Sequence, residues 1–181
     1  MSKLCVVRGW KSILNIHERS FLIPLAVAEQ VLDSLAGPGD LLWPSEQWPA
    51  MILDRGLVPG SNGGHSAIRY SVSEVVPGRR VVFEFSPMSH LGLFRGRHVF
   101  EVLPRGAKVI LRHTIDVETN FRTWFYWKLL VEQVHDAVIE DAFDKVERNV
   151  GLPQPHRSKW SWHVRLLRWW RGRQRSRSQV A

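Results

Sequence analysis

The stretch FYWKLLVEQVHDAVIEDAFDKVERNVG, residues 125–151, belongs to the longest periodic segment of the chain. Its apolar residues recur with the 3.6-residue period of an α-helix and share one broad face. Thr119 or Asn120 can cap its start, and Gly151 followed by Pro153 ends it. We therefore predict an amphipathic helix over residues 120–150 that lies on an apolar surface. The acidic residues at and beyond the far edge of that face are expected to be solvated: Glu132, Asp136, Glu140, Asp144 and Glu147.

Two segments before this helix alternate with the period of two that is typical of strands. They read IRYSVSEVVPGRRVVFEF (68–85) and GRHVFEVLPRGAKVILRHTIDVE (96–118). Each contains a turn signal, Pro77-Gly78 or Pro104-Arg105-Gly106. We predict two hairpins with strands at 66–75, 81–85, 96–103 and 108–118. Further upstream, the pattern indicates a strand over 13–23, a helix over 25–36, short helical turns around Pro44 and Pro49, and a loop over 58–64.

The second hairpin brings histidines to the apolar side of the sheet. If Val102 pairs with Val109, Phe100 faces Leu111 and His98 faces His113, all on one face. Arg97, Glu101, Lys108, Arg112 and Asp116 then occupy the solvent face. His135 lies within the apolar arc of the long helix and enters the same interior. By contrast, His65 has the outward parity of Arg69, and the face of His17 cannot be assigned.

Several roles are open for the three inward histidines. They can be core or cavity-rim residues that bond to neighbours, or a polar lining that orients a ligand. They can also act as acid/base groups. A metal site is not predicted, because no HxH or HxxxH spacing is present. No Gly-rich phosphate loop and no GxSxG motif occurs, so the sequence predicts no cofactor and no named catalytic residue.

The net charge of +8 is confined to the end of the chain. Residues 156–181 hold eight Lys/Arg and no Asp or Glu, whereas residues 1–155 hold 17 of each sign. We divide the chain into an extension (1–12), a domain (13–151), a Pro-containing linker (152–157) and a basic Trp/Arg-rich tail (158–181). The tail residues that we expect to contact an anionic partner are Trp160, Trp162, Arg165, Arg168, Trp169, Trp170 and Arg171.

As a helix, this tail would be basic and amphipathic, with tryptophans suited to lipid headgroups. Peripheral membrane contact is therefore one expectation for the tail. Nucleic-acid contact and packing of the tail on its own domain are the alternatives. Cys5 is the only cysteine, and no signal peptide or membrane-spanning run is apparent. We expect a cytoplasmic protein that can associate with membranes at their periphery.

The order of elements resembles the START-like (Bet v 1-like) superfamily, also called SRPBCC or polyketide cyclase/dehydrase-like. The resemblance covers residues 13–151 and is carried by FLIPLAVAEQVLDSLAG (21–37), WPSEQWP (43–49), the two hairpins and the closing helix. It implies an α+β helix-grip fold, in which a curved antiparallel sheet wraps a long C-terminal helix and leaves an apolar cavity. It transfers no catalytic residue.

The resemblance implies binding of a hydrophobic small molecule or lipid, so we expect a ligand-binding protein rather than an enzyme. A cyclase/dehydratase that uses pocket histidines as acid or base is the alternative. A further alternative is a ligand-free interaction module, whose cavity would be filled by Trp127, Phe83 and Phe100. The expected pocket walls are Tyr70, Val72, Phe83, Phe85, His98, Phe100, Leu111, His113, Trp127, Val131, Val134, His135 and Val138. The sequence leaves the ligand and the oligomeric state open.

Overall fold

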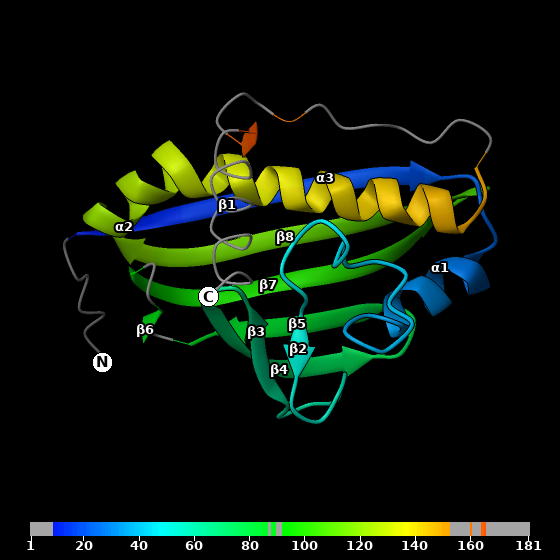
Figure 1. The fold of residues 1–181 in the computed structure, drawn as a ribbon, viewed down its shortest axis with the longest axis horizontal. Coiled ribbons are helices and arrows are strands. Elements are labelled where there is room, and N and C mark those ends of the chain that lie inside the picture. Colours follow the sequence, from blue (N-terminus) through cyan, green and yellow to red (C-terminus); the bar gives the residue numbers. More distant parts are fainter. Residues whose placement is uncertain (1–8, 87, 90–91, 153–159, 161–163, 166–181) are drawn as a thin grey trace, which may run out of the picture.

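A computed structural model describes residues 9–86, 88–89, 92–152, 160 and 164–165 (Figure 1). The strands are β1 (Trp10–Phe21), β2 (Ile52–Leu53), β3 (Asn62–His65), β4 (Ile68–Val76), β5 (Arg80–Phe85), β6 (Met88–Ser89), β7 (Gly92–Arg105) and β8 (Lys108–Asn120). The helices are α1 (Leu25–Asp33), α2 (Phe121–Tyr126), a π-helical turn η1 (Trp127–Val131) and α3 (Glu132–Asn149).

The strands form one antiparallel sheet in the order β1-β8-β7-β5-β4-β3-β2, with β6 paired to β7. Figure 1 shows this sheet curving beneath α3, with α1 at the end of the sheet that lies near the C-terminus of α3. The predicted α+β helix-grip fold is therefore confirmed. Among the described residues, no helix combines the length and apolar character needed to cross a membrane.

The ends of the long helical segment follow the sequence signals. The Asn120 side chain accepts a hydrogen bond from the Thr123 amide, as a helix cap does. At the other end Gly151 has a φ of 71°. The amides of Gly151 and Leu152 donate to the carbonyls of Arg148 and Glu147, which completes a Schellman motif. The predicted long helix is confirmed, and within it Trp127–Val131 form a π-helical turn, η1, between α2 and α3.

The register of the β7–β8 hairpin differs from our prediction by two residues. Phe100 pairs with His113, and Val102 pairs with Leu111. The strands are joined by a two-residue turn between Arg105 and Lys108, and Gly106 supplies its positive φ of 61°. An even shift preserves which face each side chain occupies. His98 and His113 are therefore both buried, as predicted, although they are not direct strand partners.

Strand β3 corrects two further expectations. Residues 62–64 are not loop, because they pair with β4 in the register Asn62–Ser71 to His65–Ile68. Gly63 and Gly64 permit this packing, since a Cβ at either position would collide with a backbone carbonyl of Ile52 or Ile68. His65 pairs directly with Ile68, so it shares the inner face of Ile68 instead of the outer face of Arg69.

Candidate functional site

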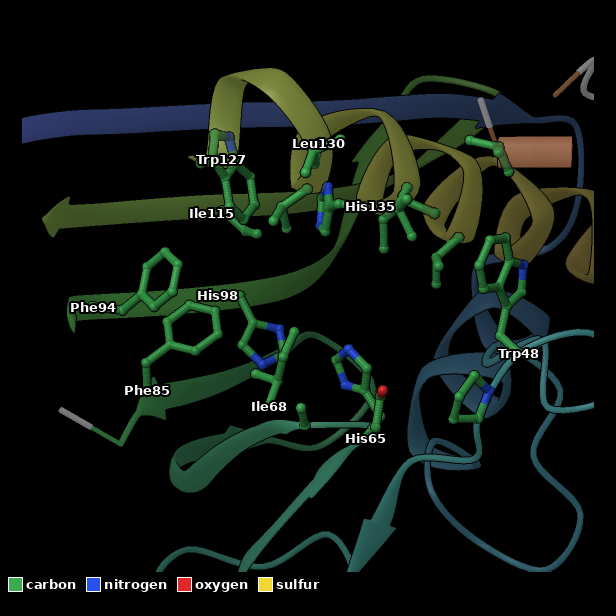
Figure 2. A pocket seen from close by; sticks show the side chains of 18 of the residues that line it. Trp48, His65, Ile68, Phe85, Phe94, His98, Ile115, Trp127, Leu130 and His135 are labelled. Carbon is green, nitrogen blue, oxygen red and sulfur yellow. The ribbon is translucent and has the colours of Figure 1, made fainter. Parts of the chain in front are cut away.

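A cavity of about 270 Å³ lies between the sheet and the helical segment that runs from α2 to α3 (Figure 2). Figure 2 shows Trp127, Leu130 and His135 projecting from the helical segment toward Phe94, His98 and His65 on the strands. The walls are mainly aliphatic and aromatic. They comprise Trp43, Trp48, Pro49, His65, Ser66, Ala67, Ile68, Phe85, Phe94, His98, Ile115, Tyr126, Trp127, Leu130, Val131, Val134, His135, Val138, Ile139 and Val164.

The expected pocket residues fall into two groups. Those that line the cavity are Phe85, His98, Trp127, Val131, Val134, His135 and Val138. Those that are buried but are not among the lining residues are Tyr70, Val72, Phe83, Phe100, Leu111 and His113. The cavity is therefore not filled by Phe83 and Phe100, which belong to the hydrophobic core around it.

Sequence reasoning missed the walls that come from the first half of the chain. Trp43 and Trp48 belong to the Pro-containing segment, which has no regular helix but one hydrogen-bonded turn, in which the amides of Gln47 and Trp48 donate to the Pro44 carbonyl. Asp40 holds this segment by accepting hydrogen bonds from the amides of Leu42 and Trp43. His65 was missed because its parity was carried across the Ser66-Ala67 turn. A two-residue turn between His65 and Ile68 would have been the signal that turns His65 inward.

Four histidines cross the interior from β3 to α3, and we call His65, His98, His113 and His135 the histidine row. His65 Nδ1 lies 3.1 Å from the Tyr70 hydroxyl. His98 stacks on Phe83 with ring centroids 4.6 Å apart, and its Nδ1 lies 3.4 Å from His113 Nε2. The His113 and His135 ring centroids are 5.1 Å apart. Neighbouring rings therefore link the far wall of the cavity to the long helix.

Burial keeps the histidine row uncharged near neutral pH. Burial lowers the pKa of His65 to about 3. The pKa values of His98 and His113 are lowered well below the usual range by the same cause. Burial also lowers the pKa of His135, although a hydrogen bond from its ring to the Asp136 carboxylate acts in the opposite direction. No described residue is a hydrogen-bond partner of His98 Nε2, His113 Nδ1 or His135 Nε2.

A charge ladder joins β1 to α3, and it consists of His17, Arg19, Asp136, Glu140, Asp144 and Glu147. His17 lies 3.0 Å from Asp136 and 2.9 Å from Glu140 through its two ring nitrogens. Arg19 contacts Glu140, Asp144 and Glu147. The expectation that the acidic edge of the long helix is solvated is therefore wrong. The inward side chains of His17 and Arg19 on β1 pack against it and offset part of its negative charge.

The charge ladder raises the pKa of His17, whereas burial lowers the pKa values of the histidine row. Burial alone would lower the pKa of His17, but hydrogen bonds to Asp136 and Glu140 and their negative charges raise it to about 9. Burial alone would raise the pKa of Asp136. Hydrogen bonds from His135, His17 and Asn15 instead hold that pKa well below its usual value. His17 is thus a cation at neutral pH.

The described tail residues pack on the domain. The Trp160 indole N–H lies 2.9 and 3.0 Å from the two carboxylate oxygens of Asp141. The Trp48 indole N–H donates to the same carboxylate at 2.7 Å. Val164 is buried and lines the cavity, whereas Arg165 is exposed. The other expected tail residues, Trp162, Arg168, Trp169, Trp170 and Arg171, lie outside the described residues.

Exposed apolar side chains lie at one side of the cavity. Tyr126 and Leu130 line it and are also exposed, so they mark its mouth. On the neighbouring helical surface, Phe121, Phe125 and Leu129 are each more than half exposed, and we call these three residues the mouth strip. Large apolar side chains gathered on one surface are typical of an interaction site.

The arrangement of strands and helices is similar to that of solved structures. A protein from Thermobifida fusca is 18% identical, with a TM-score of 0.62 over 81% of this chain and 99% of that chain. Truncated norcoclaurine synthase from Thalictrum flavum is 13% identical, with a TM-score of 0.55 over 81% and 97% of the two chains. CalU16 from Micromonospora echinospora is 10% identical, with a TM-score of 0.51 over 80% and 90%.

These similarities concern the fold, because sequence identity is low in every case. No family model and no curated protein matches the sequence. The chain therefore has the fold that the START-like resemblance implies, and a cavity lies between the sheet and the long helix.

Proposed function

We propose that this protein binds a small hydrophobic molecule or lipid in the cavity. The observation that carries the proposal is an apolar space of about 270 Å³ whose walls include three uncharged imidazoles, His65, His98 and His135. Each fully buried CH₂ group of a ligand would contribute about 0.8 kcal/mol before the costs of association. Such a surface selects a mainly apolar ligand, and the small volume limits its size.

We further propose that the protein meets its ligand at a membrane surface. The mouth strip supports this, because it places exposed Phe121, Phe125 and Leu129 beside the mouth of the cavity. Exposed Arg122 and Lys128 flank the strip; Lys128 is paired with Glu132, so the positive charge that would attract an anionic bilayer comes mainly from Arg122. The basic tail would add to this attraction, although Trp160 must leave Asp141 before it can insert into lipid.

Acid/base catalysis in the same cavity is a second candidate, which would place the protein among cyclase- or dehydratase-type enzymes. The observation that favours it is the position of His135, which lines the cavity and lies 3.5 Å from the Asp136 carboxylate. A carboxylate beside an imidazole orients the ring and stabilises its protonated form. His135→Gln separates the two candidates. If the protein is an enzyme, this variant should lose turnover but still bind its substrate. If the protein only binds a ligand, neither the parent protein nor the variant should show turnover.

The experiment is native mass spectrometry with organic extraction of protein purified from cells, comparing the full chain with a chain that ends at Gln154. A specific hydrophobic compound retained by both forms supports binding in the cavity. A compound lost with the tail would assign binding to the tail instead. Two empty forms that also fail to bind an added neutral dye such as Nile red would overturn the proposal.

A further inference from the structure

We propose that His17, His135 and Asp136 form a binding site for one divalent transition-metal ion. Each of these residues offers a donor atom, and the three donor atoms lie within 4.8 Å of one another. Sequence spacing could not reveal this site, because His17 lies on β1, 119 positions before Asp136 on α3. The inference concerns the flank of the cavity and does not depend on what the cavity holds.

The spacing of the donor atoms fits a metal ion. His17 Nε2 is 3.0 Å from Asp136 Oδ1, and His135 Nδ1 is 3.5 Å from the same oxygen. Bonds of 2.0–2.1 Å to a tetrahedral zinc place neighbouring ligand atoms about 3.3 Å apart. The two observed distances lie on either side of that value. The third separation, between the donor atoms of His17 and His135, is within 4.8 Å, so an ion would require these two imidazoles to approach each other by up to about 1.5 Å.

The groups around these donors already have the arrangement that supports a metal site. His17 Nδ1 lies 2.9 Å from Glu140, which is itself held by Arg19 at 2.5 Å. A carboxylate on the far nitrogen of a metal-bound histidine fixes its tautomer, and an ion that binds the other nitrogen would displace the proton that His17 carries there. Asn15 Nδ2 donates to Asp136 Oδ1 at 3.0 Å and orients that carboxylate in turn.

The position of the site allows both entry of an ion and contact with a ligand. The Asp136 side chain is 39% exposed, which gives the ion a path from solvent. His135 lies on the other side of the site and lines the cavity. Three protein ligands leave a coordination position for water or for an oxygen of a cavity ligand. Two imidazoles with one carboxylate favour Zn²⁺, Fe²⁺ or Co²⁺ over Mg²⁺ and Ca²⁺.

Without an ion, the same residues serve a structural purpose that the experiment must separate from metal binding. A protonated His17 bridges Asp136 and Glu140 and fastens β1 to α3. In that case His17 Nε2 and Asp136 Oδ1 are engaged with each other, and no ion would bind at a defined stoichiometry.

The test is a titration of Co²⁺ into tag-free, chelator-treated full-length protein. We expect saturation at one ion per chain, a visible d–d absorption typical of four- or five-coordinate cobalt, and its loss when Zn²⁺ is added. His17→Gln and Asp136→Asn should each weaken Co²⁺ binding at least about tenfold, and Glu140→Gln about 10–100-fold. Glu132→Gln, on the same helix and paired with Lys128, is the matched control and should bind like the parent protein.

Two results would overturn the proposal. One is the absence of saturable Co²⁺ binding to the parent protein, and the other is unchanged binding in both His17→Gln and Asp136→Asn. If circular dichroism shows that a variant is unfolded, ¹⁵N imidazole NMR of the parent protein with Zn²⁺ decides. Shifts at His17 and His135 support the site, and shifts confined to other histidines exclude it. Dye binding to the cavity is measured separately, so failure here leaves the proposed function standing.

Discussion

His98 Nδ1 and His113 Nε2 lie 3.4 Å apart across strands β7 and β8, in rings that are only 3% and 2% exposed. One ring must donate and the other accept, so at least one of the two imidazoles has to stay neutral for the pair to be held together. A proton added to either ring would be buried without a carboxylate to compensate it, since the neighbours are Phe83, Phe100 and Tyr70.

Acid should therefore destabilise this protein well above the pH at which most carboxylates titrate. His65, His98 and His113 have folded-state pKa values below the ordinary value of 6.5, so the unfolded chain binds more protons below that pH. Their contribution is complete above pH 6.5 and falls as the pH drops toward 3. In this pH range, each imidazole that stays neutral in the folded protein lowers the free energy of unfolding by about 1.4 kcal/mol for every pH unit that the pH falls. Urea unfolding at pH 7, 6 and 5 measures the loss.

A matched variant tests the assignment to these rings. His98→Phe keeps an aromatic ring against Phe83 and removes one titrating group. Its unfolding free energy should fall less steeply between pH 6.5 and 5 than that of the parent protein. An identical slope in both proteins would assign the acid sensitivity to other groups.

The fold could be predicted because its signals are local. The alternation through residues 68–85 and 96–118 marks strands, and the apolar arc with its Asn120 cap and Gly151 stop marks the long helix. The predicted register of β7 and β8 was wrong because Pro104, Arg105 and Gly106 permit more than one position of the turn. Backbone pairing and side-chain packing select the two-residue version, and an even shift left the inner face unchanged.

The site was less predictable because its residues meet only through tertiary structure. Asp136 and Glu140 look like solvated residues on a helical wheel, and only the inward His17 and Arg19 of β1 reveal their role. His65 reaches the cavity through one short turn, whose length changes the face of every residue before it. The sequence predicted an apolar interior with polar groups and part of the cavity lining, such as His98 and His135, but it could not separate these from buried neighbours such as Tyr70 and His113.

Gly96, which lies within the long strand β7, should not tolerate a side chain. It has a φ of 140°, and a Cβ there would collide with the backbone carbonyl of Asp116 on β8. We expect Gly96→Ala to lower the free energy of unfolding by about 2 kcal/mol. Gly39→Ala is the control, because its Cβ meets no atom within 4 Å. Thermal unfolding by circular dichroism compares the two, and equal midpoints would contradict this account.

Filling the cavity should abolish ligand capture without unfolding the protein. Val134 lines the cavity on α3, so Val134→Phe places additional ring atoms in that volume. We expect binding of a neutral dye to weaken at least about tenfold, with a change in stability below about 1.5 kcal/mol. Val76→Phe, on an exposed strand position, is the control. Dye binding that survives in Val134→Phe would place the ligand elsewhere.

Trp160 should fasten the start of the tail to the domain. Trp160→Phe keeps an aromatic ring near Trp48 but removes the indole N–H that lies 2.9 Å from Asp141. A hydrogen bond to a buried carboxylate contributes about 1.5–3 kcal/mol, so its loss should loosen the segment around Val164. Hydrogen exchange over residues 160–165 should become faster, and Trp124→Phe should leave it unchanged. Unchanged exchange in Trp160→Phe would show that other contacts hold the tail.

Membrane contact should depend on the mouth strip as well as on the tail. Phe125 and Leu129 are 55% and 57% exposed, so replacing both by Ser removes apolar surface without opening the core. Burying both side chains in lipid is worth about 3 kcal/mol or more, which predicts weaker binding to vesicles of anionic phospholipid by about 100-fold. Leu22→Ser is the control, because Leu22 is also more than half exposed but follows β1, far from the mouth.

Cosedimentation with vesicles at low and high salt separates the two sources of attraction. The strip's contribution should persist at high salt because it is apolar, whereas that of the basic tail should fall. Binding that is lost entirely in a chain ending at Gln154, and is unaffected by the double Ser variant, would assign membrane contact to the tail alone.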